Sequence, residues 1–272
     1  MIIAQISDMH VSSAGAAADA AYGGGARLAQ AIRHLNGLTP RPEMVLATGD
    51  LVAIGKSEEY TRLRTLLSDL ELPVYLMPGN HDDRDLLRDT FPDHPYLPST
   101  GFLNYEIDAG PFRILMLDSV VPGHSHGELC AERLDWLAGR LRQAPDRPTL
   151  VCLHHPPFST GIAKMDETIL RGADGFGRIV AANPQIERVL CGHLHRPIMR
   201  RYHGTVASTC PSTTFQITLD LEDVPRLGVI KEAPACYLHL WHPEEGLVTH
   251  TSVIGDFEQT TIFENGEWQT PG

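Results

Sequence analysis

The sequence has few of the features that mark secreted, membrane-spanning or disulfide-bonded proteins. Its five cysteines, at positions 130, 152, 191, 210 and 236, are dispersed and form no C-x-x-C pair. This usage favours free thiols in a reducing compartment over disulfides or a thiolate metal site. No apolar run approaches the length of a membrane span, and the first residues hold no basic segment followed by an apolar one. We therefore expect a cytoplasmic protein with no secretory signal and no membrane partner.

Positive charge is also scarce. The 272-residue chain has 22 Lys and Arg residues against 34 Asp and Glu residues, a formal net charge of -12, and it contains no run of basic residues. Such a chain offers little that would attract a nucleic acid backbone, so we expect no nucleic acid polymer as partner. A phosphate-containing substrate would need a local positive centre, which bound metal ions can supply.

Short apolar segments that read as buried strands end repeatedly in Asp, Asn or His. Five of them lead to Asp8 and His10, to Asp50, to Asn80 and His81, to His154 and His155, and to His193 and His195. Pockets of open α/β sheets lie at the carboxyl ends of strands. One such segment alone reads as a turn whose Asn tolerates unusual backbone angles and whose Asp caps a helix. Five together favour a metal site built from carboxylate, amide and imidazole ligands.

This series resembles the ligand pattern of calcineurin-like metallophosphoesterases, which runs D-x-H, G-D, G-N-H-[DE], H and G-H-x-H. Every part is present and in order between residues 8 and 195. The matching segments are Asp8-Met9-His10, Gly49-Asp50, Gly79-Asn80-His81-Asp82, His154 and Gly192-His193-Leu194-His195. The segments Asp82-Asp83-Arg84 and 122–128 are similar to the branch that contains bacterial class III cyclic nucleotide phosphodiesterases and glycerophosphodiesterases.

The resemblance implies a centre of two metal ions, drawn from Fe, Mn, Zn or Co, and seven ligands are also more than one ion needs. One ion would be bound by Asp8, His10 and His195, the other by Asn80, His154 and His193, with Asp50 as the bridge. A hydroxide held by the metals would attack phosphorus in line. The implied activity is hydrolysis of small phosphodiesters, either cyclic nucleotides or glycerophosphodiesters.

Neighbouring residues are expected to assist this centre. His81 would protonate the leaving oxygen, with a supporting hydrogen bond as its alternative role. Asp82 and Asp118 would orient imidazoles from behind the ligands. His155 is expected to point away, because adjacent residues at a strand end point in opposite directions.

Substrate contacts are expected from a set of side chains close in sequence to these motifs. A Gly/Ala-rich segment over residues 12–25 reads as a mobile loop beside the site, and it carries Tyr22. His124 and His126 are further candidates, with a solvated polar loop as the alternative for both.

The order of predicted elements indicates the fold. Strands and helices alternate up to residue 195, which implies βαβ units, and later strands lack long helices between them. The resemblance implies an α/β (α+β) protein, a four-layer α/β/β/α sandwich of two mixed sheets flanked by helices. We expect one domain over residues 1–265, with 208–235 as a projecting cap or interface segment, and a loose tail over 266–272. A homo-oligomer, dimer or higher, is also expected.

Three alternatives were weighed. Residues 123–127 match the G-x-S-x-G elbow of serine hydrolases, but Pro122 separates them from the preceding strand and no helix follows directly. A promiscuous phosphomonoesterase of the same fold stays open, since only the subfamily similarity favours diesters. A non-catalytic metal-binding scaffold is disfavoured because all seven ligands and His81 are present.

Overall fold

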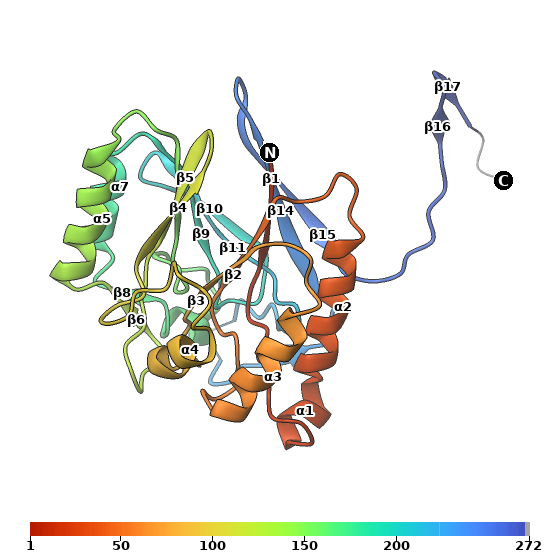
Figure 1. Ribbon diagram of the computed structural model, residues 1–272, viewed down its shortest axis with the longest axis horizontal. Coiled ribbons are helices and arrows are strands. Elements are labelled where there is room, and N and C mark those ends of the chain that lie inside the picture. The colour runs from red at the N-terminus through yellow and green to blue at the C-terminus, as the bar shows by residue number, and fades with distance from the viewer. Residues whose placement is uncertain (223, 270–272) are drawn as a thin grey trace.

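Two mixed β-sheets lie face to face and form the inner layers of the computed structural model, which describes residues 1–222 and 224–269 (Figure 1). The first sheet has the strand order β15-β14-β1-β2-β3 and the second β10-β11-β9-β7-β5-β4. Strands β1, β2 and β3 are parallel, as are β5, β7, β9 and β11. In the first sheet β14 runs antiparallel to both β1 and β15, and in the second β10 and β4 run antiparallel to their neighbours. Both predicted mixed sheets are therefore confirmed.

The bounds of the elements are as follows. The first sheet contains β1 (Ile2–Ile6), β2 (Met44–Thr48), β3 (Val74–Met77), β14 (Ala235–His242) and β15 (Gly246–Val253). The second contains β4 (Tyr105–Ala109), β5 (Phe112–Met116), β7 (Thr149–Cys152), β9 (Ile186–Cys191), β10 (Ile198–Tyr202) and β11 (Thr205–Thr209). The two-residue strands are β6 (Gly127–Glu128), β8 (Leu170–Arg171), β12 (Gln216–Ile217), β13 (Val229–Ile230), β16 (Phe263–Glu264) and β17 (Glu267–Trp268). The helices are α1 (Ala17–Tyr22), α2 (Gly24–Asn36), α3 (Ser57–Leu67), α4 (Arg84–Thr90), α5 (Ala131–Gln143), α6 (Ala163–Asp166) and α7 (Asp174–Ala181).

Helices form the two outer layers and complete the predicted four-layer sandwich. Helices α2 and α3 cover the outer face of the first sheet, and α5 and α7 cover the outer face of the second (Figure 1). The apolar stripe of α2, from Leu28 to Leu35, is buried against the first sheet, as the helical spacing of its residues predicts. A third apolar cluster, which includes Leu46 and Ile114, fills the space between the sheets. Burial of a Leu or Ile side chain contributes about 1.5–3 kcal/mol, so these three clusters hold the layers together.

The segment expected to be a mobile loop over residues 12–25 is instead largely helical. It contains α1 and the first residues of α2. Alanine has the highest helix propensity, and Gly23 ends α1 in a left-handed conformation with φ of 66°. Gly24 allows a close approach, because a Cβ atom there would collide with the carbonyl oxygen of His10. These glycines therefore serve tight packing, and the prediction that read them as flexibility is wrong.

The predicted cap segment over 208–235 divides into two parts. Its first part is buried, with Cys210 and Thr213 fully inaccessible. Its later part forms the short β12-β13 ladder and exposes apolar side chains, among them Leu219, Leu221 and Leu227. The assignment of this segment as a cap or interface stays a prediction.

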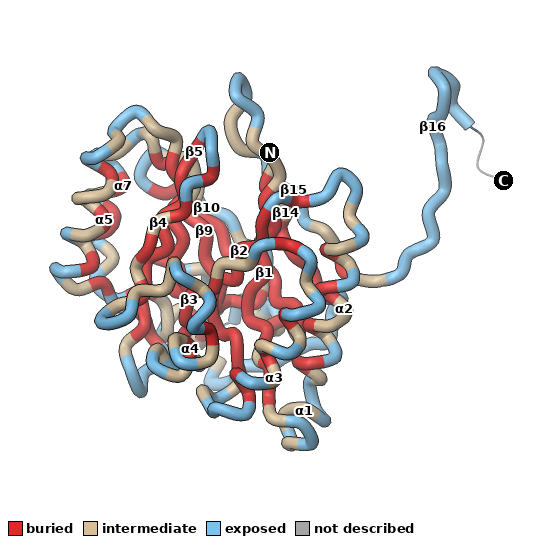
Figure 2. The backbone as a smooth tube through the Cα atoms, viewed as in Figure 1, coloured by how far each residue is buried: buried red, intermediate tan, exposed pale blue. Residues whose placement is uncertain are grey.

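The C-terminal residues leave the body after β15 and extend away from it as an exposed arm that ends in the β16-β17 hairpin (Figure 2). Residues 270–272 of the predicted tail lie outside the described residues. The proposed domain boundary at 265 stays a prediction.

Candidate metal centre and substrate pocket

The ends of strands from both sheets meet at one point. Parallel pairing aligns the ends of β1, β2 and β3, since Ile6 lies opposite Ala47 and Thr48 lies opposite Met77. Backbone hydrogen bonds then hold the loops that follow in register: His10 N donates to Asp50 O, and Gly192 N donates to His154 O, both at 3.0 Å. The loops after β1, β2, β3, β7 and β9 thereby bring all seven predicted ligands to one end of the molecule.

The backbone at the predicted ligands is strained. Asp8, His10, Asp50, His193 and His195 all have positive φ, between 43° and 71°. Residues other than glycine rarely adopt this conformation, which carries a free-energy cost of about 1–3 kcal/mol each. Five such residues at one point indicate that the surrounding hydrogen bonds impose these angles in order to aim the side chains.

The first group of donor atoms comes from Asp8, His10, Asp50 and His195, whose ligand atoms all lie within 4.8 Å of one another. His10 Nε2 lies 3.0 Å from His195 Nε2, and His195 Nε2 lies 3.4 Å from Asp8 Oδ1. Two imidazole nitrogens and a carboxylate oxygen at these separations can surround a single cation.

The second group comes from His154, His155 and His193, again within 4.8 Å of one another. Asp50 lies between the two groups, because its Oδ2 is 3.7 Å from His10 Nε2 and its Oδ1 is 3.3 Å from His154 Nε2. Asp50 is therefore within reach of both groups of donor atoms. His155 was expected to point away, and its presence in this group corrects that prediction.

Backbone carbonyls orient three of the imidazoles. His154 Nδ1 lies 2.8 Å from Thr48 O, and His195 Nδ1 lies 2.8 Å from Phe215 O, while His81 Nδ1 faces Ala53 O. Because a carbonyl oxygen only accepts, each Nδ1 must carry the proton. Each ring therefore presents Nε2 to the site, and in His154 and His195 that atom has a free lone pair when the ring is neutral.

Buried polar atoms at the centre lack protein partners. Asn80 Oδ1 and His155 Nε2 are inaccessible to solvent and make no hydrogen bond within residues 1–222 and 224–269. Leaving such an atom unsatisfied costs about 1–3 kcal/mol. A cation held by oxygen and nitrogen donors would satisfy them, so the residues present fit a metal centre.

Burial and charge set the protonation of the histidines. Burial lowers the pKa of His193 to about 3 and holds the pKa of His10 well below its usual range. Burial also lowers the pKa of His154, but the charge of Asp50 and the hydrogen bond to it outweigh burial and raise that pKa to about 9. At neutral pH, His10 and His193 are free bases, and the proton on His154 balances the carboxylates where no metal is bound.

Asp82 supports the ligand loops through their backbone. It accepts hydrogen bonds from Leu51 N, Val52 N and Gly79 N at 2.8–3.2 Å, and from Tyr60 Oη at 3.1 Å. These contacts tie the loop that carries Asp50 to the loop that carries Asn80. The expectation that Asp82 orients an imidazole is wrong, because its oxygens are occupied by these donors.

Asp118 also contacts no imidazole. It forms a bidentate ion pair with Arg84, at 2.6 and 2.8 Å, and accepts from Leu103 N and Val120 N. Its predicted role is therefore corrected as well. Backbone carbonyls and hydroxyls orient the imidazoles, and sequence motifs reveal neither group.

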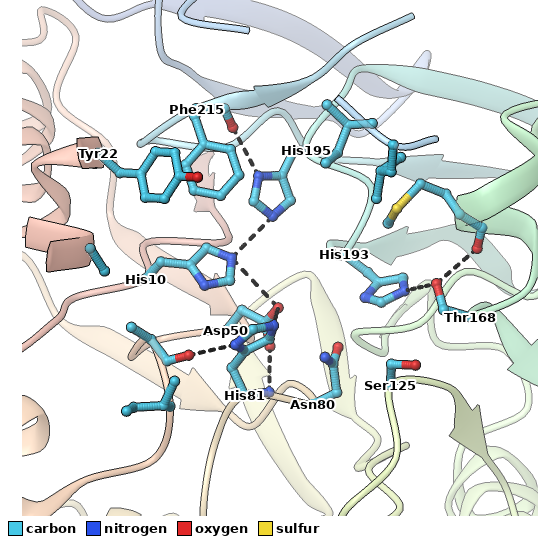
Figure 3. Close-up of a pocket in the computed structure, with 16 residues that line it drawn as sticks. His10, Tyr22, Asp50, Asn80, His81, Ser125, Thr168, His193, His195 and Phe215 are labelled. Atoms are coloured by element: carbon cyan, nitrogen blue, oxygen red, sulfur yellow. Dashed lines mark hydrogen bonds and ion pairs between the residues drawn. The ribbon is translucent and has the colours of Figure 1, made fainter. Parts of the chain in front are cut away.

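A pocket of about 370 Å³ opens over the centre (Figure 3). Its floor contains His10, Asp50, Asn80, His193 and His195, and His81 stands at its edge with 41% of its side chain exposed. The walls are mainly apolar and are formed by Ala18, Tyr22, Ala53, Ile54, Met165, Phe215, Ile217 and Leu227.

The predicted substrate contacts are placed unevenly. Tyr22 lines the pocket. His124 and His126 do not; their rings contact each other, with centroids 4.9 Å apart and planes tilted by 56°, and Ser125 between them faces the pocket instead. The pocket also contains Thr168 and Phe215, which no motif in the sequence indicates.

Comparisons with known proteins give one family. A model of the calcineurin-like phosphoesterase family matches residues 1–197. The chain is 36% identical over 266 residues, 97% of both chains, to a probable glycerophosphodiester phosphodiesterase GpdQ from Arcobacter nitrofigilis. It is 33% identical over 174 residues, 64% of this chain and 62% of the other, to the 3',5'-cyclic adenosine monophosphate phosphodiesterase CpdA of Escherichia coli K12. A dimetal phosphatase from Danio rerio has a similar fold, with a TM-score of 0.64 at 13% identity over 94% of this chain and 99% of that one.

Proposed function

The chain belongs to the calcineurin-like phosphoesterase family, and we propose that it hydrolyses small phosphodiesters, cyclic nucleotides or glycerophosphodiesters, at a binuclear metal centre in this pocket. It is a phosphodiesterase of the metallophosphoesterase class. The finer assignments, which are the two ions, the ligand roles and the substrates, are proposals supported by the geometry.

The proposed ligand set divides the donors between two ions. Asp8, His10 and His195 would hold the first, and Asn80, His154 and His193 the second, with Asp50 shared between them. Such ions supply positive charge that stabilises the phosphoryl group and polarises water. Carboxylate, amide and imidazole donors without thiolate suit Mn, Fe, Zn or Co.

The observation that carries the preference for diesters is the charge of the pocket. None of the 16 lining residues is Lys or Arg. A phosphodiester is a monoanion with two ester groups, whereas a phosphomonoester is largely a dianion at neutral pH. Because the wall has no Lys or Arg, it cannot form an ion pair with the second negative charge of a monoester. Its apolar side chains can instead pack against the second ester group of a diester. Diesters therefore fit this pocket better than monoesters.

His81 is positioned to assist the leaving group. Its ring is held through Nδ1 by Ala53 O, and its Nε2 points toward Asp50, 3.9 Å from Oδ2. Because the side chain is half-exposed at the pocket edge, a proton on Nε2 can reach an ester oxygen bound over the centre. We propose His81 as the general acid.

The experiment compares hydrolysis of bis(p-nitrophenyl) phosphate and p-nitrophenyl phosphate by the metal-stripped protein, with and without added Mn²⁺ or Zn²⁺. We expect metal-dependent hydrolysis, a higher kcat/KM for the diester, and loss of both bound metal and turnover in Asp50→Asn. A higher kcat/KM for the monoester would favour the phosphomonoesterase. Metal binding without hydrolysis of either ester would favour a scaffold.

We also propose that the chain self-associates and acts in the cytoplasm. Exposed apolar side chains support the first proposal, since Leu221 is 65% and Trp268 77% accessible. Free thiols at all five cysteines support the second. Within the described residues no helix has the length and apolar character to cross a membrane. Light scattering coupled to gel filtration would measure the oligomeric state.

A further inference from the structure

Two aromatic rings stand together on one wall of the pocket. The rings of Tyr22, at the end of α1, and Phe215, just before β12, have centroids 4.6 Å apart and an angle of 37° between their planes. Phe215 also lies over His10 and His195, with centroid distances of 5.5 and 4.6 Å. The pair, called here the aromatic wall, therefore borders the first group of metal donors (Figure 3).

Contacts with the rest of the fold hold both residues of the aromatic wall in place. The carbonyl oxygen of Phe215 accepts from His195 Nδ1 at 2.8 Å, and its buried neighbours Thr214 and Gln216 bond Met9 O and Ser212 O. Tyr22 is the last residue of α1, which an ion pair between Asp19 and Arg62 at 2.8 Å holds in place. Rings fixed in this way can bind a flat group with little further loss of conformational freedom.

Covering the buried imidazoles is the simplest role for these rings, but it does not account for their exposure. Tyr22 is 37% accessible and Phe215 is partly accessible, so part of each ring remains open to the pocket. The same pocket is lined by the apolar side chains of Met165, Ile217 and Leu227, which offer further apolar contact to a flat group.

Polar groups that could bind a polyol are few. Apart from the histidines, Asp50 and Asn80, the pocket offers the side-chain hydroxyls of Tyr22, Ser125 and Thr168. The Thr168 hydroxyl is already occupied by Met165 O and His193 Nε2, each at 2.9 Å. The hydroxyls of Tyr22 and Ser125 then remain for the two hydroxyls of a glycerol ester group, and each glycerol hydroxyl that is buried without a partner costs about 1–3 kcal/mol.

We propose that Tyr22 and Phe215 bind an aromatic or heteroaromatic ester group of the substrate by stacking, and that this chain prefers such diesters to those of small polyols. The inference rests on the proposed function and narrows its substrate class. Tyr22 and Phe215 are then specificity-determining residues, and the metal centre is common to all diesters.

The test measures kcat/KM for bis(p-nitrophenyl) phosphate and for glycerophosphoethanolamine in wild type, Tyr22→Ala and Phe215→Leu. Aromatic stacking contributes about 0.5–1.5 kcal/mol, so the aromatic-to-glycerol ratio should fall about 2- to 12-fold in each variant. Tyr22→Phe is the matched control, because it keeps the ring and should keep the ratio. Metal content, measured by mass spectrometry, should stay at the wild-type level. Unchanged ratios in both variants would overturn the proposal.

Nitrophenolate is a good leaving group, which by itself raises the rate for the aromatic ester. The preference of the wild type for an aromatic group is therefore measured with inhibitors that have no leaving group. Phenylphosphonate should bind the metal-loaded wild type at least 2-fold more tightly than methylphosphonate, and Tyr22→Ala should remove the difference. Equal inhibition by both phosphonates would refute the stacking role of the aromatic wall and would leave the proposed function unaffected. Preferential binding of phenylphosphonate with no diester hydrolysed would overturn the proposed function alone.

Discussion

Replacing Thr168 by Val removes the hydroxyl that fixes which nitrogen of His193 carries a proton. Thr168 Oγ1 lies 2.9 Å from Met165 O and 2.9 Å from His193 Nε2. The hydroxyl has one hydrogen, and Met165 O can only accept it. His193 Nε2 must then donate to the hydroxyl, which leaves the lone pair on Nδ1. On the proposed ligand set, Nδ1 of His193 is the atom that binds metal.

Valine has nearly the shape of threonine, so the change isolates the hydrogen bond. Met165 O keeps the backbone N–H of Thr168 as a donor at 3.0 Å and is not left unsatisfied. A hydrogen bond of this kind contributes about 0.5–1.5 kcal/mol. Loss of an outer partner of a metal-binding histidine typically weakens metal affinity about 10- to 100-fold. We expect the affinity for one of the two ions to fall about 10-fold and the affinity for the other to stay within about 2-fold.

The assay is calorimetric titration of metal-stripped protein with Zn²⁺ or Mn²⁺, which resolves two binding steps. Thr168→Ser is the control, because it keeps the hydroxyl and loses only a methyl group. Wild-type affinity for both ions in Thr168→Val would refute the tautomer argument. Equal losses in Thr168→Val and Thr168→Ser would assign Thr168 to packing instead.

Three further predictions concern His81, Gly192 and His154. In His81→Ala, turnover of esters with poor leaving groups should fall up to about 10²–10⁴-fold, and that of nitrophenyl esters much less; equal losses in steady-state kinetics would contradict a general acid. Gly192→Ala should lower the free energy of unfolding by about 1–3 kcal/mol in denaturant titrations, because a Cβ would collide with Ser7 Oγ and Thr48 O, whereas Gly123→Ala, where a Cβ meets no atom within 4 Å and only the positive φ of 78° opposes the change, should cost less. The pKa of His154 is raised from 6.5 to about 9 in the folded, metal-free protein. Protonation of His154 therefore stabilises the fold by roughly 3 kcal/mol at most below pH 6.5, and this stabilisation is lost as the pH rises through 9. The melting temperature of the metal-free protein should fall across that window, and a His154→Gln variant with the same slope would contradict the assignment.

The layers, and the meeting of the proposed ligands at one edge, could be predicted because both leave local patterns. Runs such as Val151–Leu153 are too apolar to lie anywhere but in a buried strand, and the side chains that follow them are the donor types that metals prefer. Parallel pairing then carries these strand ends to one edge, so sequence order alone places Asp8, Asp50 and Asn80 together.

The groups that orient the proposed ligands could not be predicted. Some are backbone carbonyls, which every residue has, and others come from residues that are distant in the sequence. The carbonyls of Thr48 and Phe215 orient histidines, yet any residue has a carbonyl group. Phe215 is 20 residues from His195 and follows no motif. The glycines near Gly24 were read as flexibility, although their role is the close approach of α2 to His10.

The exposed part of the pocket wall and the proposed metal centre lie on different elements of the fold, and this separates selectivity from reactivity. Donors such as Asp50 and His193 follow buried strands, and strained backbone angles and hydrogen bonds fix their positions. Tyr22 and Ile54 lie on a short helix and a loop and are at least one-third exposed. A substitution at Tyr22 or Ile54 meets few packed neighbours, whereas one at Asp50 or His193 disturbs loops that follow buried strands of the two sheets. The pocket can therefore change the ester group that it accepts while the proposed metal ligands stay in place.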